Sequence, residues 1–151
     1  MPESPAPKAY EAVCIHATAQ GSSALTLDAE SAGIRKLVAD LYLVHQCLKS
    51  GGVLLLDDGD RNLHADILPH LLHLFADRDI NTRNAQLLFT SLSSDTMDIL
   101  GGHGIYLFEK EQSESYCFRL DEPETNIIRN GGSIAASYRR RFLGGYPRIE
   151  P

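Results

Sequence analysis

"GGVLLLDDGDRNLH", from Gly51 to His64, sets four apolar residues directly before two aspartates. A short apolar run between turn residues predicts a buried strand, here Val53 to Leu56. Two adjacent carboxylates at the end of such a strand need water, a hydrogen-bond partner or a cation, because unpaired charges are costly to bury. The surroundings of Asp57 and Asp58 therefore decide what this strand end does.

Upstream of this stretch, the sequence predicts a β-hairpin followed by a long helix. The segments EAVCIHA and ALTLDA flank the Gly/Ser turn TAQGSS, which is the pattern of two antiparallel strands. Apolar residues then recur at spacings of three or four, between an N-cap at Ser31 and a stop at Gly51. The residues expected on the buried face of this helix are Leu37, Leu41, Val44 and Leu48.

Downstream, a helix over residues 65–77 leads to a second continuously apolar strand, AQLLFTS, at residues 85–91. A short helix over residues 94–100 follows, with Ser94 or Asp95 as its cap. The remaining expected elements are an antiparallel strand pair at 104–110 and 115–121, a turn at 130–133 and a closing helix at 133–142.

This order of elements predicts an α/β fold. Continuously apolar strands that alternate with helices indicate a mostly parallel sheet covered on both faces, a three-layer sandwich, with antiparallel additions at the termini. Ligands of such sheets bind at the carboxyl ends of the strands. Asp57 and Asp58 follow one strand, and Thr90 and Ser91 follow the next. We therefore expect polar groups from two strands at one edge of the sheet.

Composition and charge narrow the class of protein. The 151 residues suffice for one domain, which we place at residues 9–151 after a flexible tail at residues 1–8. The net charge of -6 argues against an extended nucleic-acid-binding face, which needs clustered Lys and Arg. The basic run Arg139 to Arg141 is interpreted as a solvated helix face.

The cysteines and the apolar segments predict a cytoplasmic protein. Cys14, Cys47 and Cys117 are far apart and form no CxxC pair, which favours reduced thiols over a zinc knuckle or a disulfide framework. The N-terminal residues have neither the basic nor the apolar part of a signal peptide. No apolar stretch approaches the length of about 18 residues that a membrane span requires, so no membrane association is expected.

The acidic pair after an apolar strand is the pattern of a Walker B motif. In that motif the first carboxylate holds Mg²⁺ and the second acid orients or activates the attacking water. The charge of the metal lets both carboxylates stay ionised side by side. Asp57 is thus a candidate metal ligand and Asp58 a candidate catalytic residue. A strand that simply exits into a polar turn is the alternative, since DDGD is also good turn chemistry.

The order of motifs resembles the C-terminal half of ABC-type ATPases of the overcoming-lysogenization-defect-like class. These are AAA-type ATP-binding proteins of bacterial phage-defence and toxin–antitoxin systems. The resemblance extends over residues 11–149, and its motifs are ESAGIRKL, GGVLLLDDGDRNLH, AQLLFTSLS, GIYLFEK and YRRRFLGGYP. It implies a partial P-loop NTPase fold of the ABC type, with a signature, a Walker B strand, a D-loop and a switch strand, and with ATP and Mg²⁺ as cofactors.

The resemblance also implies roles for single residues. Ser31 and Gly33 match the signature, whose family role is to contact the γ-phosphate of a nucleotide held by a partner subunit. Asp57 matches the Mg²⁺-linked aspartate, and Asp58 stands at the position of the catalytic glutamate. The D-loop end is matched by Leu63 and His64, and the switch by Thr90, Ser91 and Leu92.

Several departures from the family pattern concern the phosphate site itself. No G-x-x-x-x-G-K-[ST] occurs in the sequence, so the loop that cradles the triphosphate is absent from these residues. Asp58 is one methylene shorter than glutamate, and catalytic geometry tolerates such a displacement poorly. Leu92 replaces the switch histidine and can neither hydrogen-bond a phosphate nor carry a proton. Ile34 removes a hydroxyl from the signature.

Two functions remain open at this point. The first is an ATPase half-domain that is inactive alone and needs a P-loop partner chain or a homo-oligomer. The alternative is a non-catalytic interaction module that retains the fold without binding nucleotide. A sheet without its P-loop unit would expose an edge or an apolar face, so both readings predict association.

Two further patterns have ordinary explanations. His70 and His73 with Asp66 could form a metal-binding helix face, although surface histidines on a helix are commoner than metal sites. The segment GGHG at residues 101–104 precedes a strand instead of opening a helix, so it predicts a turn and not a phosphate loop.

Overall fold

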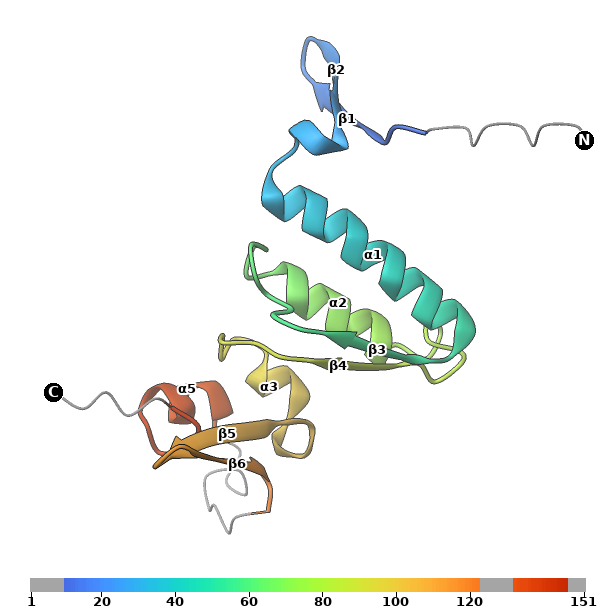
Figure 1. The fold of residues 1–151 in the computed structure, drawn as a ribbon. Coiled ribbons are helices and arrows are strands. Elements are labelled where there is room, and N and C mark those ends of the chain that lie inside the picture. The colour runs from blue at the N-terminus through green and yellow to red at the C-terminus, as the bar shows by residue number, and fades with distance from the viewer. Residues whose placement is uncertain (1–9, 123–131, 147–151) are drawn as a thin grey trace, which may run out of the picture.

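The computed structural model describes residues 10–122 and 132–146. The predicted tail at residues 1–8 lies outside these ranges. Figure 1 shows three small strand pairs along the chain, with the N-terminal hairpin beyond the start of the long helix. In that hairpin, β1 (Val13–Thr18) pairs antiparallel with β2 (Gly21–Thr26), as the sequence predicts. A short 3-10 turn, η1 (Leu27–Ala29), leads from it to the first helix.

The long helix α1 (Ala32–Ser50) has the predicted ends. The Ser31 hydroxyl accepts a hydrogen bond from the Ile34 N–H at 3.2 Å, and Gly51 ends the helix in the left-handed region with φ of 77°. Its buried residues are Asp40, Val44 and Cys47.

One residue expected on the buried face of α1 lies outside it. Leu41 is 43% exposed, so its predicted place in the core is wrong. The buried stripe passes instead through Asp40, whose carboxylate is paired with Lys36 Nζ at 2.5 Å. An i, i+4 ion pair allows a charged residue on the buried face, and the next residue then turns toward solvent.

The centre of the fold is a parallel strand pair joined by a helix. β3 (Val53–Leu56) leads through α2 (Ile67–Ala76) to β4 (Gln86–Phe89), and β3 and β4 pair in parallel from Val53 opposite Gln86 to Leu56 opposite Phe89. α1 contacts β3 and α2 contacts β4, and Figure 1 shows both helices on the same side of the pair. The α/β class and the parallel arrangement of these strands are thereby confirmed.

The opposite face of this strand pair is bare. Leu55 is 70% exposed, and Val53 and Leu88 are 58% and 52% exposed. Among the described residues, no third strand joins the pair. The expected mostly parallel sheet with helices on both faces is therefore not formed by this part of the chain, because only two strands are parallel and only one face is covered.

The C-terminal unit is a hairpin covered by two short helices. It contains α3 (Met97–Leu100), the 3-10 turn η2 (Gly102–Gly104), β5 (Tyr106–Glu111), β6 (Glu114–Arg119) and α5 (Ile134–Arg139). β5 and β6 are antiparallel, which confirms the antiparallel additions at both ends of the chain. The core of this unit consists of Ile105, Leu107, Leu120, Ile134 and Leu143.

Three boundaries in this unit differ from the prediction. The hairpin turn is only Gln112 and Ser113, because both adopt positive φ and close a tight turn. α3 begins after Thr96, and neither expected residue caps it. α5 ends at Arg139, and Arg141 takes a left-handed conformation with φ of 61°, which is incompatible with a continuing helix.

Candidate functional site

The ends of β3 and β4 are joined by the hydroxyl of Thr90. This hydroxyl donates a hydrogen bond to Asp57 Oδ1 at 2.7 Å and accepts one from the Asp58 N–H at 2.8 Å. The backbone continues the link, since Gly59 N–H donates to the Thr90 carbonyl at 2.8 Å. The aspartate pair thus has a hydrogen-bond partner on the neighbouring strand, as the parallel register requires.

The two carboxylates of the acidic pair point to different partners. Asp57 is held by Thr90, whereas Asp58 Oδ2 lies 3.4 Å from Arg61 Nη1 with 48% of its side chain exposed. The backbone of Asp58 has a positive φ of 50°, a left-handed conformation that aspartate adopts in turns more readily than most residues. The candidate catalytic acid therefore lies on a solvent-facing turn.

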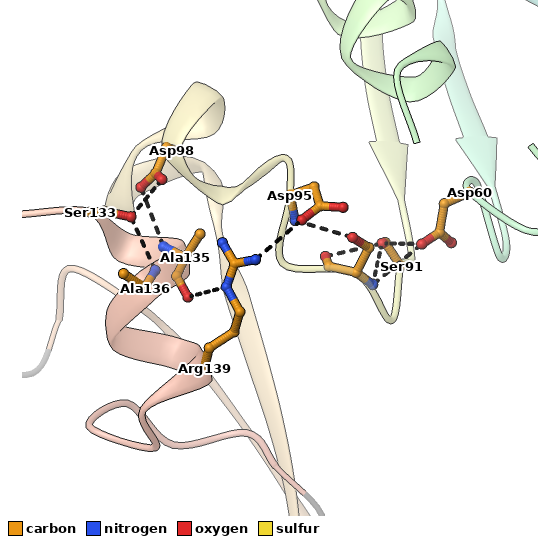
Figure 2. A network of polar contacts seen from close by, with 9 residues as sticks. Asp60, Ser91, Asp95, Asp98, Ser133, Ala135, Ala136 and Arg139 are labelled. Carbon is orange, nitrogen blue, oxygen red and sulfur yellow. Dashed lines mark hydrogen bonds and ion pairs between the residues drawn. The ribbon is translucent and has the colours of Figure 1, made fainter. Parts of the chain in front are cut away.

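Ser91 uses its hydroxyl in the same way, one residue further along. It donates to Asp60 Oδ2 at 2.8 Å, and the Ser93 N–H donates to the same oxygen at 3.3 Å. Figure 2 shows Asp60 and Ser91 facing each other at the ends of neighbouring strands. Asp60 was not among the predicted site residues, although the third acid of DDGD opposite a serine could have indicated it.

The start of α1 lies against the loop that follows β3. A Cβ atom on Gly33 would lie 2.5 Å from the carbonyl oxygen of Asn62, so only glycine fits there. Ser31, which caps α1, and Gly33 are therefore at the same loop as Asp57 and Asp58. Lys36, one helical turn on, reaches the Gly59 carbonyl at 3.5 Å and was missed by the sequence reasoning, because lysine on a helix usually points to solvent.

Polar contacts continue from this loop into the C-terminal unit (Figure 2). The Ser93 hydroxyl accepts from the Asp95 N–H at 3.1 Å, and Asp95 Oδ1 lies 3.7 Å from Arg139 Nη1 on α5. Arg139 Nε donates in turn to the Ala135 carbonyl at 3.3 Å. The Arg139 side chain is 62% exposed, as the sequence predicts for a solvated helix face, and it takes part in this surface ion pair.

Asp98 joins α3 to α5. Its carboxylate accepts from the Ser133 hydroxyl at 2.7 Å and from the Ile134 N–H at 2.6 Å. The Ser133 hydrogen bond, with those of the Ala135 and Ile134 N–H groups and the charge of Arg139, lowers the pKa of Asp98 below its usual value despite the opposing effect of burial.

Asp57 and Thr90 together offer oxygen donors that suit Mg²⁺. This ion is usually held by one or two carboxylates, with water and substrate phosphates as the other ligands. Within the described residues, no group of three His, Cys, Asp or Glu side chains could hold a metal ion. Asp57 and Thr90 alone would leave the other ligand positions of such an ion to water or to phosphate oxygens.

His70, His73 and Asp66, for which the sequence left a metal site open as the less common case, form no group that could hold a metal ion among the described residues. His70 Nδ1 contacts the backbone oxygen of Asp66 at 2.6 Å, while the Asp66 carboxylate lies 3.4 Å from His64. The Asp66 carboxylate and the His70 imidazole therefore have different partners and do not bind a common metal ion.

Comparison with known proteins gives no match. No protein-family model, no curated protein and no solved structure is similar to this chain. Within residues 10–122 and 132–146, no helix combines the length and the apolar character that a membrane crossing requires. The residues that meet at the loop after β3 are therefore the observations that bear on function.

Proposed function

We propose that this chain is the signature and Walker B half of an ABC-type ATP site, and that it works with a partner that carries the P-loop. The observation that supports this most directly is that two separate segments meet the loop that begins with Asp57 at the end of β3. Gly33 at the start of α1 lies against Asn62, and Thr90 at the end of β4 hydrogen-bonds Asp57 and Asp58. These are the segments that the resemblance to ABC-type ATPases assigns to the nucleotide.

Each residue has a chemical task in this proposal. Asp57 and the Thr90 hydroxyl hold the Mg²⁺ ion, which when bound neutralises charge on the transferred phosphoryl group. Asp58 is the acid that orients the attacking water, with its backbone N–H fixed by Thr90. Ser31 and Gly33 begin a 19-residue helix, whose N-terminus favours the negative charge of a γ-phosphate.

The partner is proposed to complete the sheet as well as the site. The strand residues VLLL and QLLF contain no charge and no proline, which are the features that protect natural sheet edges from pairing. Val53, Leu55 and Leu88 leave an apolar face without a helix layer. A P-loop unit that adds strands at the edge and a helix on this face would produce the three-layer sandwich expected from the sequence.

A second candidate function is a non-catalytic interaction module. It is favoured by the observation that Thr90 and Ser91 already hydrogen-bond Asp57 and Asp60, which links the ends of the two strands without a ligand. It is also favoured by Leu92, which is 95% exposed at the position of the switch histidine and offers no polar group.

Titration of the purified chain with ATP, with and without Mg²⁺, separates the two functions. Binding that requires Mg²⁺, without hydrolysis, supports the half-site. The absence of binding supports the interaction module. ATP hydrolysis by the pure chain would contradict the need for a P-loop partner.

A further inference from the structure

A pocket of about 170 Å³ lies beside the strand ends, between the loop after β3 and the loop before α3. It takes no part in the proposed ATP site. Its walls combine apolar and polar residues: Leu63, Ala65 and Leu68 make up the apolar wall, and Asp60, Ser93, Asp95 and Thr96 make up the polar wall, wherever each lies around the pocket.

Both carboxylates of the polar wall keep an oxygen available. Asp60 accepts its hydrogen bonds from Ser91 and Ser93 on Oδ2 alone, and Oδ1 has no hydrogen-bond partner among the described residues. Asp95 Oδ1 lies 3.7 Å from Arg139, which is an ion-pair distance beyond a good hydrogen bond. The pocket is thus an acceptor-rich site, in which Asp60 Oδ1 has no donor among the described residues and Asp95 Oδ1 has only the Arg139 guanidinium, at 3.7 Å.

Thr96 provides an independent indication of a missing ligand. The residue is only 4% exposed, and in the described part of the chain its hydroxyl makes no hydrogen bond. Its carbonyl alone is used, by the N–H groups of Ile99 and Leu100. A buried hydroxyl without a partner is unfavourable, so a polar group in this pocket would relieve the cost.

The chemistry of the walls selects the ligand. Leu63, Ala65 and Leu68 in the lining disfavour a divalent cation, which keeps several waters and oxygen ligands around it. An ammonium group carries three donors and no acceptor, which matches Asp60, Asp95 and Thr96. The three apolar residues can pack against a short alkyl stem. Long cationic side chains commonly lay their methylene groups along apolar surface in this way.

We propose that this pocket binds a primary alkylammonium group, either as the lysine side chain of a partner polypeptide or as a free small amine. The proposal does not depend on the ATP site. It uses Asp60 Oδ1, whereas Ser91 and Ser93 bind Oδ2. None of the residues proposed to hold Mg²⁺ or phosphate lines the pocket.

An NMR titration of the ¹⁵N-labelled chain with n-butylammonium chloride tests the proposal, with sodium chloride at matched ionic strength as the reference. Saturable shifts of the Ser93 and Thr96 amides are expected with the amine and not with sodium. Asp60→Asn should weaken binding at least about tenfold, the range for a lost hydrogen bond to a charged group. Asp79→Asn removes the same charge from an exposed turn after α2 and should leave binding unchanged.

Thr96→Val separates binding from folding. The substitution removes the hydroxyl at nearly constant shape, so we expect a melting temperature no lower than that of the wild type together with weaker amine binding. Nα-acetyl-lysine methylamide then distinguishes the two sources. Binding at least as tight as that of n-butylammonium assigns the pocket to a lysine of a polypeptide, and exclusion of this compound assigns it to a free amine.

Two results would overturn the proposal. One is the absence of saturable shifts with both amines. The other is equal binding by Asp60→Asn and Asp79→Asn, which would mean that the amine is attracted only by the net charge of the chain.

Discussion

Thr90 is the residue on which the geometry of the strand ends depends. Its one hydroxyl donates to Asp57 and accepts from the Asp58 backbone, so it fixes both members of the acidic pair. A sequence reading can place a threonine at the end of a parallel strand, and here it correctly predicted that Thr90 would be near Asp57. It cannot show that the two residues share a hydrogen bond, because that depends on the register.

Substitution of Thr90 by valine should lower the free energy of unfolding by about 1 kcal/mol, the usual net value of a protein hydrogen bond. Urea unfolding followed by circular dichroism measures the change. Thr26→Val is the matched control, since the Thr26 side chain makes no cap hydrogen bond and its loss should change stability by less than about 0.5 kcal/mol. Equal values for the two variants would contradict the role given to Thr90.

Gly33 tests the contact between α1 and the loop after β3. Ala normally stabilises a helix relative to Gly by up to about 1 kcal/mol. Here the added Cβ would lie 2.5 Å from the Asn62 backbone oxygen, so we expect Gly33→Ala to destabilise the chain by about 1–3 kcal/mol. Gly52→Ala, where the nearest atom is the Ser50 hydroxyl at 3.5 Å, is the control for thermal unfolding. Stabilisation by Gly33→Ala would show that the contact is absent.

Helices and strands with a clear periodicity of apolar residues could be predicted from the sequence. Boundaries and buried faces that depend on contacts with distant residues could not. The periodicity, the N-cap Ser31 and the stop at Gly51 are local signals, so α1 was predicted with the right ends. The displacement of Leu41 from the core depends on the Lys36–Asp40 pair, which no periodicity reveals. The start of α3 likewise depends on the surrounding loop and not on its nearest polar residues.

The candidate site shows the same division. The pairing of β3 with β4 followed from two apolar strands on either side of a helix, and it brought Asp57 to Thr90. Asp60 was missed because its partners, Ser91 and Ser93, lie in the loop after β4, about thirty residues further along the chain. Tertiary contacts of this kind leave no pattern in a local window.

Asp98 links α3 to α5 through hydrogen bonds to its carboxylate. Its lowered pKa makes the strength of this link depend on pH. Because the pKa is lower in the folded chain, Asp98 stabilises the fold above its unfolded value near 4 and loses this effect as the pH falls through the folded value. Asp98→Ala should therefore cost about 1 kcal/mol at pH 7, the usual worth of a helix cap. The difference from the wild type should shrink below about pH 4.

Urea unfolding at pH 7 and at lower pH measures this difference. Asp66→Ala is the control, since Asp66 stands at the N-cap position of α2 without a cap hydrogen bond. A gap between Asp98→Ala and the wild type that stays constant down to pH 2 would contradict the assignment.

For the molecule as a whole, the bare face of the β3–β4 pair is the feature that predicts association. Val53, Leu55 and Leu88 are each more than half exposed on this face, and contiguous exposed apolar residues mark interaction sites. Leu55 is central among these, at 70% exposure on the uncovered face.

Sedimentation of the pure chain at increasing concentration should show species larger than a monomer, and Leu55→Lys should shift them toward the monomer. Leu92→Lys introduces the same charge at a residue that is 95% exposed in the loop after β4 and should have little effect. A monomer at high concentration, or equal behaviour of the two variants, would contradict a docking role for this face.

We propose that Asp57 and Thr90 hold a magnesium ion that arrives with a triphosphate. Calorimetric titration of the pure chain with Mg-ATP is the decisive measurement, with Asp57→Asn as the test variant and Asp66→Asn as the control. We expect a dissociation constant below about 1 mM, or about 4 kcal/mol of binding free energy, for the wild type and the control, and loss of binding in Asp57→Asn. No heat of binding for the wild type, or the same affinity in Asp57→Asn, would rule out a magnesium site at these two residues.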